Sequence, residues 1–109
     1  LGAANKGTLS SVALHDVFAS QKSGTMAFYT LTASVTDIPF SDGNGCNALI
    51  IKYDNAAGRI FAWHYQQNTT YFQIKSGNSW SDWQRVYDTS ILTDSTILSP
   101  LASALKPYL

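Results

Sequence analysis

Few residues in this chain could perform chemistry. The 109 residues include two His, one Cys and seven acidic residues, all of them Asp. Neither His15 nor His64 has a second ligand at the spacing that a metal site requires, and Cys46 alone excludes an internal disulfide. Asp82 and Asp88 could act as a carboxylate pair, but no nucleophile motif accompanies them. We therefore expect no metal site, no cofactor and no enzymatic activity.

The residues point more strongly to binding than to catalysis. Trp80 and Trp83 stand three positions apart near the end of the run 71–88, and Arg85 follows them. Indole rings and guanidinium groups stack on flat ligands such as sugars, while amide and guanidinium groups bind hydroxyls. The candidate ligand-binding residues are Tyr71, Gln73, Trp80, Trp83, Arg85 and His64.

The role of the two tryptophans depends on the element that holds them. If 80–87 is one strand, Trp80 and Trp83 point to opposite faces of a sheet. One ring then packs inward and the other reaches a ligand, and Trp80, beside the turn, is the better candidate for the outer position. The alternative is that both rings brace the core or the turn.

The position of His64 depends on a second expected strand, 59–66. Its three aromatic residues, Phe61, Trp63 and Tyr65, alternate with smaller ones and share one face. Because a face with three aromatic rings is usually the buried one, we expect His64 on the accessible face.

The composition limits the possible partners. Charged residues make up 13% of the chain and the formal net charge is zero, against about 25% charged residues in an average domain. A nucleic-acid interface is not expected because no basic patch is present. A membrane span is not expected either, because no apolar run approaches about 20 residues. A weakly charged surface favours self-association and suits an extracellular or virion-exposed protein.

The pattern of apolar residues and turns predicts a mainly β fold, either an antiparallel meander or a small sandwich, with short flanking helices. Strands rich in β-branched and aromatic residues alternate with Gly, Asn and Asp turns. The expected strands are 26–35, 48–53, 59–66, 70–75 and 80–87.

The rest of the chain divides into flanking segments. Residues 1–8 have the composition of a linker, 9–90 form the β-rich domain, and 91–109 form a short helical tail or connector. Residues 10–21 fit either a helix or a strand. In the tail we expect a helix from Leu101 to Leu105 with Ser99 as its N-cap. Because the chain begins at Leu1 without a Met, we expect it to be part of a longer protein.

The run 71–88 resembles the end of the pyocin-knob type of domain, which occurs in phage tail fibres and related tail-like bacteriocins. The resemblance consists of a Tyr-Phe-Gln-Ile strand, a Gly-containing turn and a W-x-x-W pattern followed by Arg and Tyr. It covers about residues 26–90. Within it, Trp80, Trp83 and Arg85 match the motif.

This resemblance implies a β-rich, homotrimeric receptor-binding module that recognises a polysaccharide on a bacterial surface. Its partners would be neighbouring tail-fibre domains, and its location the virion tail, after synthesis in the bacterial cytoplasm. Three linked copies would strengthen a weak contact. The alternative is a structural module that joins or trimerises a tail fibre and binds no ligand of its own.

Overall fold

The computed structural model describes residues 4–40, 43–64, 69–86 and 95–108. Within these residues the chain forms seven strands, two α-helices and a 3₁₀ helix. In chain order they are β1 (Ala4–Leu9), α1 (Leu14–Ser20), β2 (Thr25–Leu31), β3 (Cys46–Asp54), β4 (Ala57–Trp63), β5 (Thr70–Ser76), β6 (Ser79–Trp80), β7 (Gln84–Arg85), α2 (Ser95–Leu105) and η2 (Lys106–Tyr108).

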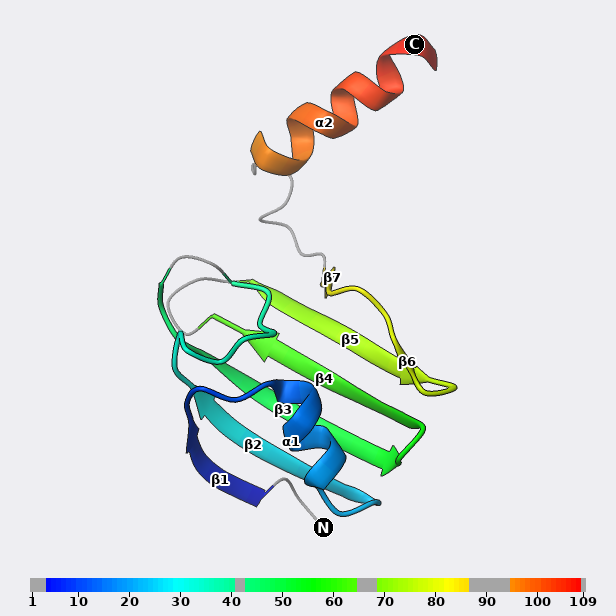
Figure 1. Cartoon of the computed structure of the whole chain (residues 1–109). Coiled ribbons are helices and arrows are strands. Elements are labelled where there is room, and N and C mark those ends of the chain that lie inside the picture. The colour runs from blue at the N-terminus through cyan, green and yellow to red at the C-terminus, as the bar shows by residue number, and fades with distance from the viewer. Residues whose placement is uncertain (1–3, 41–42, 65–68, 87–94, 109) are drawn as a thin grey trace.

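The strands form one sheet in the order β1-β2-β3-β4-β5-β6, and β7 pairs with β5 beside β6 (Figure 1). β1 runs parallel to β2, and every other pair is antiparallel. The mainly β fold is therefore confirmed. Of the two predicted architectures, the meander is the one that the described residues adopt.

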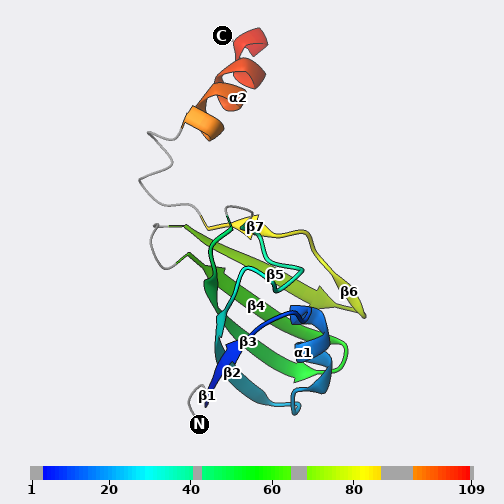
Figure 2. The same ribbon diagram turned by 60° about the vertical axis from the view of Figure 1, so that its left-hand side comes forward.

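The N-terminal segment differs from the prediction that residues 1–8 are a linker. Residues 4–9 lie within or beside the expected linker, yet they form β1, and the amide of Thr32 donates to the carbonyl of Leu9 at 3.0 Å. Two parallel neighbouring strands need a crossover connection, and α1 supplies it (Figure 2). The segment 10–21, which fitted either a helix or a strand, therefore contains the helix α1.

The core lies between α1 and one face of the sheet (Figure 1). Leu14 and Phe18 of α1 are fully buried there, above alternate residues of the central strands. Those strand residues are Ala27, Tyr29, Leu31, Cys46, Ala48, Ile50, Ile60 and Ala62. Most of them are short or β-branched, which lets the helix approach the sheet closely.

The faces of β4 are the reverse of the prediction. Ile60, Ala62 and His64 point into the core and are 3% exposed or less, whereas Phe61 and Trp63 are half-buried on the opposite face. The error has a physical cause: the helix needs small partners beneath it, so the large rings are placed on the other face. Tyr65, the third predicted aromatic of that face, lies outside the described residues.

The expected strand 80–87 is also interrupted. β6 and β7 each have two residues and pair with β5, while Ser81 leaves the ladder and binds Ile74 through its backbone amide and its hydroxyl. Because the strand is broken, Trp80 and Trp83 do not point to opposite faces. Both are partly buried against the same core, which matches the alternative that both rings brace it.

The C-terminal helix begins earlier than expected. α2 starts at Ser95, so Ser99 and Pro100 lie inside the helix and Ser99 is not its N-cap. Pro107 falls within η2, just after the helix ends. In Figures 1 and 2, α2 lies apart from the sheet.

Candidate functional site

Trp80 is the centre of an aromatic cluster on the core side of β5 and β6. Its ring stacks on the imidazole of His15, with centroids 4.4 Å apart and planes 3° from parallel. It also meets Phe18 edge to face at 4.9 Å. The ammonium of Lys75 lies 5.9 Å from the centroid of the indole. A face of the ring that could stack on a sugar is thus taken by His15.

His15 is held by side chains from two other segments. Its Nε2 lies 2.8 Å from Oε1 of Gln73, and its Nδ1 lies 3.7 Å from Oδ2 of Asp37. Gln73 is only 6% exposed, so its amide serves this internal hydrogen bond. The imidazole therefore joins α1 to β5.

Asp37 caps the start of α1 from a distant part of the chain. The N-cap residue Ala13 has no side chain that can bond to the helix, and the carboxylate of Asp37 accepts the amides of Leu14 and His15 instead. Negative charge is favourable at a helix N-terminus. The backbone carbonyl of Asp37 also accepts a hydrogen bond from Nε1 of Trp83, at 3.2 Å. Trp83 thereby fixes the capping residue in place.

Lys52 holds the other end of α1. Its side chain is 2% exposed, and its ammonium donates to the carbonyls of Phe18 and Ala19 at 2.9 and 3.0 Å. The same ammonium lies 5.1 Å from the centroid of the Phe18 ring. Positive charge at a helix C-terminus and over a ring face offsets the cost of burying the cation. The short helix is thus held at both ends by opposite charges.

The remaining predicted residues lie beyond this cluster. His64 is 3% exposed and meets Phe40 edge to face at 5.3 Å, so the expectation that His64 is accessible was wrong. Tyr71 meets the same ring at 5.4 Å. Arg85 is half-buried in β7 and pairs with Tyr71 across the ladder.

The structure brings five of the six predicted site residues into contact with the loop 37–40 or with α1, and Arg85 is the exception among these contacts. The five are Tyr71, Gln73, Trp80, Trp83 and His64. Sequence reasoning missed the two residues that organise them, Asp37 and Phe40. No local signal could have found Asp37, because it acts on a helix more than 20 residues away. Ligand binding by the six stays a prediction, and the observed contacts are those of a brace between helix and sheet.

The site offers little reactive chemistry in the part of the chain that the structure describes. Within that part, no group of three or more His, Cys, Asp or Glu is placed to hold a metal ion. Burial raises the pKa of the Tyr29 phenol, which stays uncharged at neutral pH. No described helix is long and apolar enough to cross a membrane.

A second candidate site is the sheet face opposite α1, called here the open face. Cross-strand pairing aligns one residue from each of four neighbouring strands in a row formed by Phe28, Leu49, Phe61 and Phe72. A second row beside it contains Met26, Ile51, Arg59 and Ile74. Phe28 lies 5.8 Å from Trp63, and Phe61 lies 6.2 Å from Phe72, between ring centroids.

No described helix covers the open face, because α1 lies on the other side and α2 lies apart (Figures 1 and 2). Its large apolar side chains are half-buried. An apolar patch of this kind is typical of a surface that meets another protein.

The comparisons with known proteins give one structural likeness. No family model matches this sequence, and no curated protein matches it. Among solved structures, the fold is similar to that of an N-truncated R2-type pyocin tail fibre, with a TM-score of 0.62 and 18% sequence identity over 82% of this chain. The chain spans 36% of the length of that fibre chain. At this identity the likeness concerns the fold.

Proposed function

We propose that this chain is a non-catalytic module of a tail-fibre-type protein and that it assembles as a homotrimer through the open face. The observation that supports it most is the uncovered apolar row across four strands. The likeness of the fold to a pyocin tail fibre supports the same setting, a virion or virion-like tail. The number of three copies comes from the resemblance of the run 71–88 to tail-fibre knob domains.

The physical chemistry of the open face favours contact between copies. Each Å² of apolar surface removed from water contributes about 25 cal/mol of favourable free energy. Burial of the aromatic and aliphatic side chains of these rows would therefore strongly favour association. Charge repulsion between copies is small because the formal net charge is zero. In the two rows, Arg59 is the charged residue, and its exposed side chain can reach the rim of such an interface.

Replacing Phe61 by lysine should convert the assembly to single chains. Phe61 lies inside the row, between Leu49 and Phe72, so a lysine there would place a charge in the middle of the interface. Light scattering after size-exclusion chromatography should give three times the chain mass of 11.9 kDa for the native protein and one chain mass for the variant.

The matched control is Ala19→Lys, which adds the same charge on the exposed surface of α1, on the other side of the sheet. It should leave the mass of the assembly unchanged, and circular dichroism should show the same strand content for all three proteins. A native protein that runs as a monomer would refute the trimer. A Phe61→Lys variant that stays trimeric would refute the open face as its interface.

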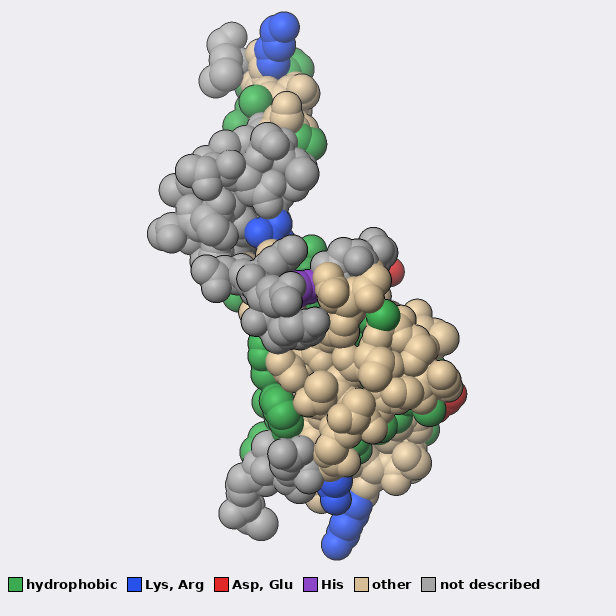
Figure 3. Space-filling view, turned by 90° about the vertical axis from the view of Figure 1, so that its left-hand side faces the viewer, with side chains coloured by type: hydrophobic (Ala, Val, Ile, Leu, Met, Phe, Trp, Pro, Cys, Tyr) green, Lys and Arg blue, Asp and Glu red, His purple; other side chains and the backbone are tan. Residues whose placement is uncertain are grey.

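Adhesion to a bacterial surface glycan is the second candidate function. A specific observation favours it: one side of the sheet domain is covered over its centre mostly by uncharged polar side chains and backbone (Figure 3). Surfaces of this kind form hydrogen bonds with hydroxyl groups without the desolvation cost of charged side chains. Three copies in one assembly would multiply a weak contact with a repetitive polymer.

An array of bacterial surface polysaccharides distinguishes the two functions. The trimer should be retained by at least one polysaccharide, and Phe61→Lys should bind it more weakly because avidity is lost. A native trimer that binds none would leave the purely structural role. Release of soluble sugars from purified capsule would instead show that the protein is an enzyme and would contradict the proposal.

A further inference from the structure

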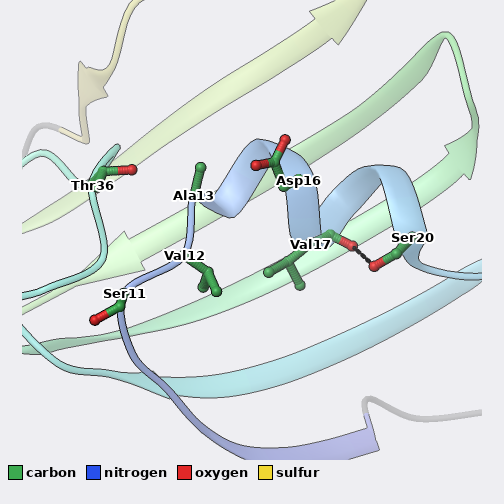
Figure 4. A pocket seen from close by; sticks show the side chains of 7 residues that line it. All are labelled: Ser11, Val12, Ala13, Asp16, Val17, Ser20 and Thr36. Carbon is green, nitrogen blue, oxygen red and sulfur yellow. Dashed lines mark hydrogen bonds between the residues drawn. The ribbon is translucent and has the colours of Figure 1, made fainter.

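Two shallow hollows flank the segment 32–36. One, of about 480 Å³, opens beside the first turns of α1, where Asp16, Ser20 and Thr36 surround Val12 and Val17 (Figure 4). The other, of about 490 Å³, lies at the end of β2 and the start of β3, and four of its eight lining residues carry a hydroxyl or amide group. Those side chains are Thr30, Thr32, Asn44 and Asn47.

A ridge of hydrogen-bonded hydroxyls joins the two hollows. Ser34 Oγ accepts the amide of Ser11 at 2.9 Å and lies 2.6 Å from Oγ1 of Thr32, which also bonds to Ser10 Oγ at 3.1 Å. Ser11 has a φ of 55°, an uncommon conformation for a residue other than glycine, and its amide is directed at Ser34. Each hydroxyl is one donor and two acceptors, so these bonds leave capacity for a ligand.

The charge of the lining restricts the ligand. Among the described residues that line the two hollows, Asp16 is the charged one, and none is Lys or Arg. A phosphate or a uronate would meet this exposed carboxylate without a compensating cation. A neutral sugar would instead donate hydroxyl protons to Asp16 and to the side-chain carbonyl of Asn47.

We propose that the two hollows and the ridge between them bind a neutral polyhydroxylated chain, such as a stretch of uncharged polysaccharide. The inference rests on the glycan-binding part of the proposed function, and it places the binding site away from the tryptophans. Trp80 and Trp83 brace α1 against the sheet, whereas the hydroxyls of the ridge and of the first hollow are on the surface. Thr30 and Asn47 of the second hollow lie at the edge of the open face, beyond its two apolar rows, where a polymer can reach them beside the interface.

Amide chemical shifts of the assembled protein test the location. The probes are millimolar methyl glycosides of glucose, galactose, mannose and rhamnose, with glucuronic and galacturonic acids as charged counterparts. We expect at least one neutral glycoside to shift the amides of Ser11, Thr36 and Asn47, and the acids to leave them unchanged. Shifts confined to the surroundings of Trp80 and Trp83 would overturn the location but leave adhesion standing. Equal shifts with the acids would overturn the restriction to neutral ligands, and an absence of shifts with every neutral glycoside would overturn the inference.

Variants test the same site against a polysaccharide that the array retains. Thr36→Ala and Asn47→Ala should each weaken binding about five- to tenfold, the effect of one hydrogen bond, while Ser23→Ala, an exposed hydroxyl outside both hollows, should not. Asp16→Lys should weaken the binding of neutral ligands and allow uronates to bind. Full binding by the Thr36 and Asn47 variants would overturn the site while adhesion stands. A trimer that binds nothing on the array would refute adhesion itself.

Discussion

Replacing Phe18 by alanine is expected to lower the free energy of unfolding by about 3–5 kcal/mol. The ring is fully buried and, with Leu14, forms the apolar contact between α1 and the sheet. It meets Trp80 edge to face at 4.9 Å, and the ammonium groups of Lys52 and Lys75 lie 5.1 and 5.2 Å from its centroid. The loss would be a large part of the total, because small domains are stable by only about 5–15 kcal/mol.

Urea denaturation followed by tryptophan fluorescence would measure this loss. All proteins must be compared at one concentration, because the stability of an assembly depends on concentration. The matched control is Val12→Ala, which removes an apolar side chain that is 37% exposed just before the helix, and it should change stability by less than about 0.5 kcal/mol. A loss below about 1 kcal/mol for Phe18→Ala would mean that the ring does not hold the helix on the sheet.

Replacing Gly58 by alanine is the second substitution with a large expected effect, about 1–3 kcal/mol or more. A Cβ atom at this position would lie closest to Cε2 of Phe18, and it would also lie 2.5 Å from the carbonyl oxygen of Ile51 and 2.8 Å from Cζ of Phe18. Because the Ile51 oxygen is backbone, a side-chain rotation cannot remove that contact, and the hairpin of β3 and β4 has to shift.

A double-mutant cycle with Phe18→Leu separates the two obstacles. The shorter side chain should relieve the clash with the ring, so the two losses should fall short of additivity by at least about 0.5 kcal/mol. The clash with Ile51 should remain, and Gly58→Ala should still destabilise the Phe18→Leu background. Strict additivity would show that the ring is no obstacle, and no loss in that background would show that the backbone contact is not limiting.

The central strands could be predicted because their signals are local. The turns around Asp54 and Gly77 are rich in Gly, Asn and Asp, and the strands beside them are rich in β-branched and aromatic residues, as local rules require. β1 was missed because the stretch from Ala4 to Leu9 has small residues and no alternation, and its pairing with β2 depends on a partner across a helix.

Which face of β4 packs against the helix could not be predicted from the sequence. Both faces of this strand carry apolar residues, so alternation alone does not tell which face the helix covers. The answer depends on Phe18, which needs Gly58 beneath it and therefore selects the face with Ile60 and Ala62.

Most of the residues that the sequence singled out lie near one another, but the partners that hold them could not be predicted. Trp80, Trp83 and Gln73 do lie in one cluster, yet their partners come from α1 and from Asp37, which sequence spacing cannot bring together. The hydroxyl ridge was not predicted either. Ser10 and Ser34 carry no sequence signal, and the fold alone brings the segment after β1 next to the loop after β2.

The two charged caps on α1 have a consequence for the order in which the chain folds. A helix of seven residues is far below the roughly 12–15 residues at which isolated helices become even marginal in water. Its caps are Asp37 and Lys52, which leave the ribosome well after the helix itself. α1 should therefore stay unformed during synthesis until β3 has emerged, and the helix then forms together with the sheet in one cooperative step.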